Sequence, residues 1–151
     1  MPNDVNLVNE VRVRVLEATR ETTRVPSAAE LSRALGCSVS DVVGAFAQLG
    51  DSHVFVLEPG DPTRLRMANP YSAVPTAFRV ETAGRSYYGN CVWDALGIVS
   101  LLGGEGTVRT ACPDCREPLQ LEVMGGRLLT QAGLVHFSVP ARHWWDDIIH
   151  T

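Results

Sequence analysis

Two helix starts separated by one helix-stopping glycine constrain the N-terminal half of this chain most strongly. Ser27 precedes Glu30 by three residues, and Ser38 precedes Asp41 by the same interval. In such a pair the serine hydroxyl caps the amide of the acid, and the carboxylate caps the amide of the serine. Gly36 lies between the two pairs, and glycine readily adopts the left-handed backbone that ends a helix. The sequence therefore predicts two helices joined by a very short turn.

These signals define the outline of an N-terminal domain. We expect helices over residues 28–35 and 39–49, the second ended by Gly50, after an amphipathic helix within residues 5–22. Two β-prone runs then flank the turn-forming stretch PGDP and predict a β-hairpin. Three helices followed by a hairpin are typical of a winged-helix-like domain, which we place at residues 1–70.

Residues 71–151 are predicted to form a second domain with antiparallel strand pairing. A tight hairpin is expected at Ala83 and Gly84, followed by a helix from Cys91 to about Leu102. The stretches GTVRTACPDC and PLQLEVMGG alternate apolar and polar residues like two strands joined through a CxxC, and GLVHFSVP predicts another strand. The predicted fold class is α+β, a winged-helix-like helical domain followed by an antiparallel-sheet domain with one short helix.

Composition and charge restrict the classes of function. A chain with 45% hydrophobic and 20% charged residues is typical of soluble globular proteins. No apolar run reaches the roughly 20 residues of a membrane span, and no signal peptide precedes the first helix, so we expect a cytoplasmic protein. Residues 1–70 carry seven arginines against nine acids, and Gln48 is the only long polar side chain of the presumed recognition helix. Nucleic-acid binding is therefore not favoured.

The stretch YYGNCVWDALG contains the pair of residues that is the strongest candidate for a reactive site. With Asn90 as N-cap, Cys91 would occupy the first helical position, where amides and the helix dipole favour a thiolate. Asp94 lies three residues further, on the same helix face. A thiolate beside a carboxylate disfavours double ionisation, so that one proton is retained near the sulfur. The same pattern also fits a buried thiol beside a helix-starting acid, and spacing alone leaves both readings open.

The stretch ACPDC forms a second cysteine motif. Cys112 and Cys115 are spaced as half of a four-ligand zinc site, as a redox pair, or as two structural thiols. No second CxxC is present, so a closed four-cysteine site within one chain would need Cys91 or Cys37. The candidate metal ligands are Cys91, Cys112 and Cys115, with mercury or zinc as the ion.

The segment from about Thr76 to Ser100 resembles the catalytic segment of the organomercurial (alkylmercury) lyases. In that family a strand hairpin leads into a Y-x-x-C-x-x-D helix start, here Tyr88, Cys91 and Asp94. The resemblance extends to an N-terminal winged-helix-like domain and to a later cysteine-containing strand region. It implies that Cys91 captures mercury as a thiolate and that Asp94 relays a proton to the departing carbon, so both would be catalytic.

The resemblance also implies a second cysteine, which in this chain would be expected beyond Thr151. We therefore expect a shortened or divergent member of the family, acting on a small organometallic or other small-molecule substrate without a cofactor. Small thiols or a downstream mercury acceptor would be its partners, and no membrane would be involved. The alternatives are a homologue that binds thiophilic metal ions without this catalysis, and a winged-helix metal-responsive regulator.

Overall fold

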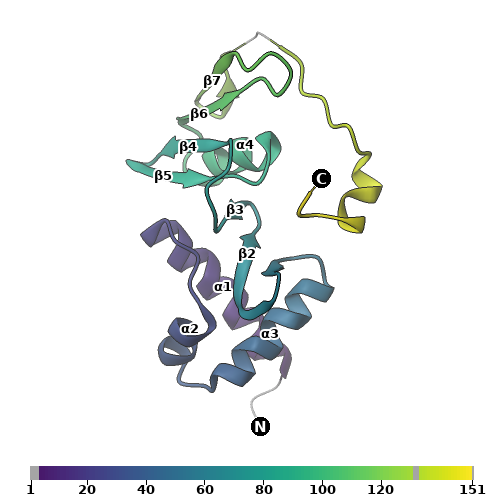
Figure 1. Cartoon of the computed structure of the whole chain (residues 1–151). Helices are drawn as coiled ribbons and strands as arrows, with labels where there is room; N and C mark the ends of the chain where they lie inside the picture. The colour runs from purple at the N-terminus through teal and green to yellow at the C-terminus, as the bar shows by residue number, and fades with distance from the viewer. Residues whose placement is uncertain (1–3, 131–132, 151) are drawn as a thin grey trace.

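The computed structural model describes residues 4–130 and 133–150 (Figure 1). It combines helices with two antiparallel sheets, which confirms the predicted α+β class. The hydrophobic core is divided into two clusters, one under the N-terminal helices and one under the second sheet. Within the described residues, every helix is too short or too polar for a membrane crossing.

Three helices and a small sheet build the N-terminal part. In chain order these elements are α1 (Asp4–Thr22), α2 (Ala28–Leu35), α3 (Val39–Asp51), β1 (Val56–Glu58), β2 (Asp61–Ala68) and β3 (Tyr71–Ser72). The strands pair antiparallel in the order β1-β2-β3. Their core is formed by buried apolar side chains from all three helices and the hairpin, including Val11, Val15, Leu31, Val42, Phe46, Leu49, Phe55 and Leu65.

Both predicted capping boxes are confirmed. Glu30 accepts a hydrogen bond from the Ser27 amide over 2.8 Å, and Asp41 accepts one from the Ser38 amide over 3.0 Å. Each serine hydroxyl accepts in return from the amide of its acid. Gly36 adopts the left-handed conformation between the helices, with φ of 68°. Local signals therefore fix the turn between α2 and α3.

The end of α3 differs from the prediction. Gly50 does not stop the helix, which continues to Asp51, and the chain reverses at His53 with φ of 59°. A Cβ atom at Gly50 would lie 2.8 Å from Leu57 Cδ1. The glycine at this position therefore leaves space for a side chain of β1 rather than ending the helix.

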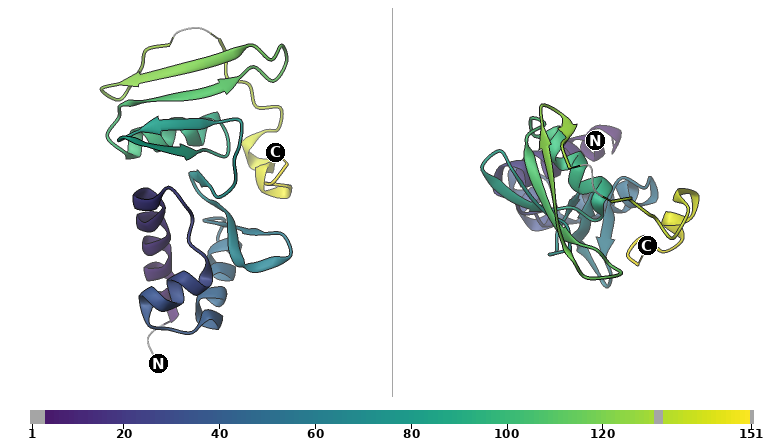
Figure 2. Two further views of the ribbon diagram at one scale, coloured as in Figure 1. Left: turned by 60° about the vertical axis from the view of Figure 1, so that its left-hand side comes forward. Right: turned by 90° about the horizontal axis from the view of Figure 1, so that it is seen from above.

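A five-stranded antiparallel sheet and one helix build the C-terminal part. In chain order these elements are β4 (Arg79–Thr82), β5 (Arg85–Tyr88), α4 (Val92–Leu101), β6 (Gly106–Ala111), β7 (Pro118–Met124), β8 (Arg127–Leu128) and the 3-10 helix η1 (Ala141–Asp146). The strand order is β5-β4-β6-β7-β8, with α4 packed on one face (Figure 2). The predicted hairpin is confirmed, with positive φ at both Ala83 and Gly84, and so are the two strands flanking the CxxC.

The strand predicted for GLVHFSVP is wrong. The described residues 133–140 form no strand, and the side chain of Leu134 is 99% exposed. An apolar run becomes a strand only when another strand offers it hydrogen bonds, and here none does within the described residues. The chain continues into η1, and the Trp145 ring stacks on His53 with ring centroids 4.1 Å apart.

The N-terminal and C-terminal parts meet around β3. Tyr71 pairs with Ala68 of the first sheet and forms a bridge with Gly89, which follows the second sheet. The hydroxyl of Tyr87 donates to the carbonyl of Arg20 in α1 over 2.7 Å. The proposed domain boundary after residue 70 stays a prediction, since this segment joins both parts through backbone contacts.

Candidate active site

A close crossing of backbone positions the start of α4. The chain leaves β5 at Tyr88 and passes Gly89 before it reaches Cys91. A Cβ atom on Gly89 would lie 2.7 Å from the amide nitrogen of Ala95 in the first turn of α4. No side chain fits that gap without moving the backbone, so the glycine allows the strand end and the helix start to touch. This contact fixes where the candidate residues lie.

Cys91 is the N-cap of α4 and not its first helical residue. Its backbone is extended, with φ of −145° and ψ of −179°, and the helix begins at Val92. The prediction that Asn90 caps this helix is therefore wrong by one residue. The amide N–H groups of Asp94 and Trp93 face the Cys91 sulfur, although neither makes a full capping hydrogen bond.

Cys91 and Asp94 are brought together as predicted. The Cys91 thiol and the Asp94 carboxylate lie close enough for each to affect the pKa of the other, and both side chains are partly buried. Burial raises the pKa of Asp94. Burial also raises the pKa of Cys91, and the neighbouring carboxylate adds to that rise against the opposing effect of the amides. The helix start thus does not produce the low thiol pKa expected from the sequence, because removal from water outweighs it.

Asn90 holds the carboxylate from the other side, a role that the sequence analysis missed. Its Nδ2 donates to Asp94 Oδ2 over 3.0 Å and also lies 3.2 Å from Asn69 Oδ1 and 3.3 Å from the Pro70 carbonyl. Its own Oδ1 is buried without a hydrogen-bond partner. The signal in the sequence was an amide side chain directly before the candidate cysteine, but its partner Asn69 is distant in sequence.

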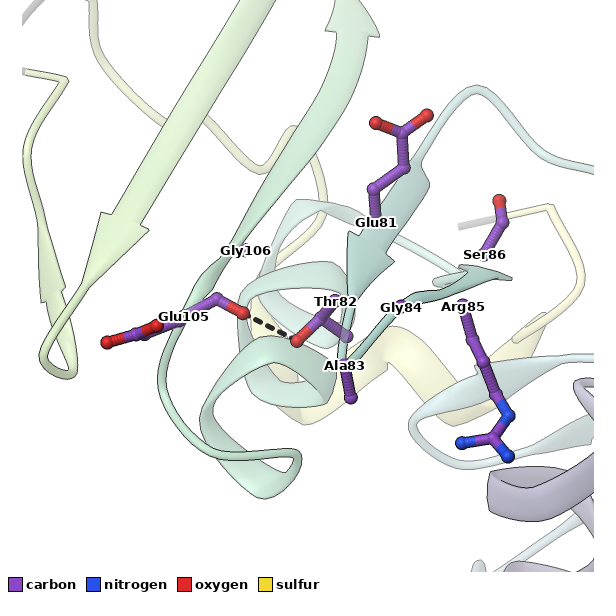
Figure 3. Close-up of a pocket in the computed structure, with 8 residues that line it drawn as sticks. All are labelled: Glu81, Thr82, Ala83, Gly84, Arg85, Ser86, Glu105 and Gly106. Carbon is purple, nitrogen blue, oxygen red and sulfur yellow. Dashed lines mark hydrogen bonds between the residues drawn. The ribbon is translucent and has the colours of Figure 1, made fainter.

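Two surface pockets lie away from this pair. One is formed at the β4–β5 turn, where Thr82 donates a hydrogen bond to the Glu105 carbonyl over 2.6 Å (Figure 3). Thr82 pairs with Arg85 and Gly106, so this pocket lies at the end of the sheet opposite to Tyr88. The other pocket lies between the α1–α2 connection and β2. Neither is lined by Cys91 or Asp94.

The ACPDC motif forms the tip of the β6–β7 hairpin. The amide of Arg116 donates to the Cys112 carbonyl over 2.9 Å, and the amide of Cys112 donates to the Glu117 carbonyl over 2.9 Å. Arg116 has φ of 64°, which closes the turn. The pKa of Cys112 is lowered, because the amides of Cys115 and Asp114 and the Cys115 thiol face its sulfur.

The structure does not bring all three predicted metal ligands into one group. Across residues 4–130 and 133–150, no three His, Cys, Asp or Glu side chains lie close enough together to hold one metal ion. Cys91, Cys112 and Cys115 therefore do not form one ligand group, and Cys37 packs beside the N-terminal core. All four cysteines are free thiols.

Comparisons with known proteins identify a family and a related fold. The family described as MerB, alkylmercury lyase, matches residues 71–151, the part that contains the Cys91–Asp94 pair. Among solved structures, the mercury-bound form of MerB2 matches with a TM-score of 0.65 and 18% identity over 86% of this chain. At that identity the likeness is one of fold, and this chain spans 60% of the length of that structure. None of the curated proteins matches.

Proposed function

The chain belongs to the alkylmercury lyase family, and we propose that it cleaves the carbon–mercury bond of a small organomercurial compound by protonolysis. The observation that carries this proposal is the placement of the Cys91 thiol beside the Asp94 carboxylate at the start of α4, where each group affects the pKa of the other. Cleavage needs a soft ligand for mercury and a proton for carbon, and this pair holds both. The fold shared with a mercury-bound structure supports mercury as the element recognised.

The first step is capture of mercury by sulfur. Burial raises the pKa of Cys91, which favours the neutral thiol, and the mechanism starts from that thiol beside an ionised Asp94. As the sulfur bonds to the organomercury cation, the thiol proton moves to Asp94. The strong preference of mercury for sulfur drives this transfer, because the proton is exchanged for a softer partner.

The second step is protonation of carbon. The proton on Asp94 passes to the mercury-bound carbon, and the electron pair of the carbon–mercury bond forms the new carbon–hydrogen bond. The hydrocarbon leaves, and divalent mercury remains on the Cys91 sulfur beside the ionised Asp94. Mercury keeps its oxidation state throughout. A small thiol or another mercury acceptor then supplies a second sulfur and removes the ion.

We assign a supporting role to the N-terminal part, which we propose to be a winged-helix-like domain over residues 1–70. Asn69 contacts Asn90 beside the active pair, and Arg20 accepts the hydrogen bond of Tyr87. These contacts support a role in holding the second sheet and α4. The chemistry requires a reduced Cys91, which the cytosol maintains, and we therefore propose a cytoplasmic location.

The test is hydrocarbon release from phenylmercury in excess small thiol, measured as benzene by gas chromatography. We expect release by the wild-type chain and none above background by Cys91→Ser. Asp94→Ala should lose about 10²- to 10⁴-fold in rate, the usual contribution of a general acid. Cys37→Ser is the matched control, since it removes a thiol outside the site, and it should retain the rate.

The same experiment identifies a failure of the proposal. Tight mercury binding without benzene in the wild-type chain would contradict cleavage and indicate a metal-binding homologue. Benzene release that persists in both Cys91→Ser and Asp94→Ala would contradict the assigned residues. Circular dichroism of each variant separates loss of chemistry from loss of fold.

A further inference from the structure

The two cysteine-bearing segments leave the second sheet at the same end. Strand β4 lies between β5 and β6, and Arg79 of β4 is paired with Tyr88 on one side and Arg109 on the other. Because both neighbours run antiparallel to β4, β5 and β6 point in the same direction. Cys91 follows Tyr88 by three residues, and Cys112 follows Arg109 by three residues.

The CxxC motif therefore lies at the same end of the sheet as Cys91 and Asp94. Neighbouring strands are about 4.8 Å apart, so the two strand ends lie on the order of 10 Å apart. Strands β6, β7 and β8 form the half of the sheet further from the N-terminal helices (Figure 2). Cys112 is partly exposed and Cys115 is exposed, so their thiols are accessible to a dissolved ion.

The turn arranges the two sulfurs as a chelating pair. The hydrogen bonds between Cys112 and Glu117 and between Arg116 and Cys112 close the loop on both sides of the motif. The turn places the Cys115 thiol and the backbone amides of Asp114 and Cys115 close enough to the Cys112 sulfur to lower its pKa. Amides in this position stabilise negative charge on sulfur, which two bound thiolates would develop.

The number of ligands selects the ion. Within the described residues no third His, Cys, Asp or Glu joins the two cysteines as a ligand group. Zinc in structural sites requires four ligands, whereas a divalent mercuric ion is satisfied by two thiolates in a line. We propose that Cys112 and Cys115 form a dithiol site for a two-coordinate soft metal ion, separate from the Cys91–Asp94 pair, with the mercuric ion as its occupant.

Binding is an exchange without oxidation or reduction. Each thiol releases its proton to solvent, and the mercuric ion forms two sulfur–mercury bonds. The chelate effect gives this site a higher affinity for mercury than any single cysteine has, because a second thiolate held nearby acts at high effective concentration. A single cysteine loses mercury to an excess of a monothiol, whereas the pair retains it.

The experiment uses the full chain carrying Cys91→Ser, mercuric chloride at one equivalent and excess 2-mercaptoethanol, so that cleavage plays no part. After gel filtration we expect one mercury per chain, and alkylation with iodoacetamide should modify Cys37 but leave Cys112 and Cys115 protected. Adding Cys115→Ser should lower the affinity for mercury, in competition with the monothiol, by about 100-fold or more. Adding Cys37→Ser should change nothing.

Unchanged retention in the Cys115→Ser variant, or alkylation of Cys112 and Cys115 in the mercury-loaded chain, would overturn the proposal. The alkylation pattern of the wild-type chain gives the same answer if the double variant does not fold. Since the ion is inorganic, failure here leaves the cleavage proposal untouched, and failure of cleavage leaves this site untouched.

Discussion

The side-chain amide of Asn90 donates to Asp94 Oδ2 over 3.0 Å. The Cys91 thiol also affects the pKa of this carboxylate. The acid is therefore held between an amide and a sulfur. Burial raises the pKa of Asp94, and the hydrogen bond from Asn90 acts in the opposite direction. Asn90 is thus a positioning residue, and its hydrogen bond limits how far burial raises the pKa of Asp94.

Replacing Asn90 with alanine should raise the pKa of Asp94 further, because it removes the hydrogen bond that does most to lower this pKa against the effect of burial. In the proposed mechanism Asp94 must be ionised to accept the thiol proton. We expect Asn90→Ala to lower the cleavage rate about tenfold, the value of one hydrogen bond to a charged group, and to move the acidic limb of the pH–rate profile to higher pH. Asn69→Ala is the control, since Asn69 contacts Asn90 but not Asp94. An unshifted profile in Asn90→Ala would contradict this role.

Two glycines around α4 should respond to alanine in opposite ways. At Gly89 the added Cβ would meet the amide of Ala95 at 2.7 Å, so we expect a loss of about 1–3 kcal/mol in the free energy of unfolding. At Gly97, inside α4, an added Cβ would meet nothing within 4 Å beyond the neighbouring backbone of its own helix, and alanine should stabilise the helix by about 0.5–1 kcal/mol. Urea unfolding of the two variants checks both signs, and equal destabilisation would show that the crossing at Gly89 tolerates a side chain.

The elements that the sequence predicted well carry their signals locally. The starts of α2 and α3 follow from Ser27 and Ser38, each of which finds its capping acid three residues away. The contact of Cys91 with Asp94 was predictable for the same reason, since it depends only on the spacing within one helical turn. Local hydrogen bonds need little help from the rest of the chain.

The features that the sequence did not predict depend on distant partners. Asn90 has the chemistry of an N-cap, but its amide is engaged by Asp94 and by Asn69, and Cys91 takes the cap position. The direction of the Cys91 pKa shift depends on burial, which is determined by packing from several elements. The expected strand after Gly133 failed because strand formation requires a neighbour that periodicity cannot reveal.

The raised pKa of Asp94 predicts a pH-dependent difference in stability. The folded protein binds this proton more tightly than the unfolded chain does, so the free energy of unfolding falls as pH rises above the ordinary value of 3.8 through the raised folded pKa. Asparagine does not ionise, so Asp94→Asn should be more stable than the wild-type chain at neutral pH. Urea unfolding at several pH values should show this gain disappearing below 3.8. A gain that is constant with pH would contradict it.

Glu30 should show the opposite sign. Its pKa is lowered to about 2, first by the hydrogen bond from Arg24 and then by the amide and hydroxyl of Ser27. A lowered folded pKa contributes stability that is complete above the ordinary value of 4.5 and is lost as pH falls through about 2. Glu30→Gln keeps a capping acceptor but removes the charge, and because the Arg24 side chain is 66% exposed, we expect a loss of only about 1 kcal/mol at neutral pH. Urea unfolding should show that loss shrinking toward about pH 2 and weakening in ~1 M salt, which screens exposed pairs. A loss independent of both pH and salt would mean that the helix cap, and not the ionised carboxylate, stabilises the start of α2.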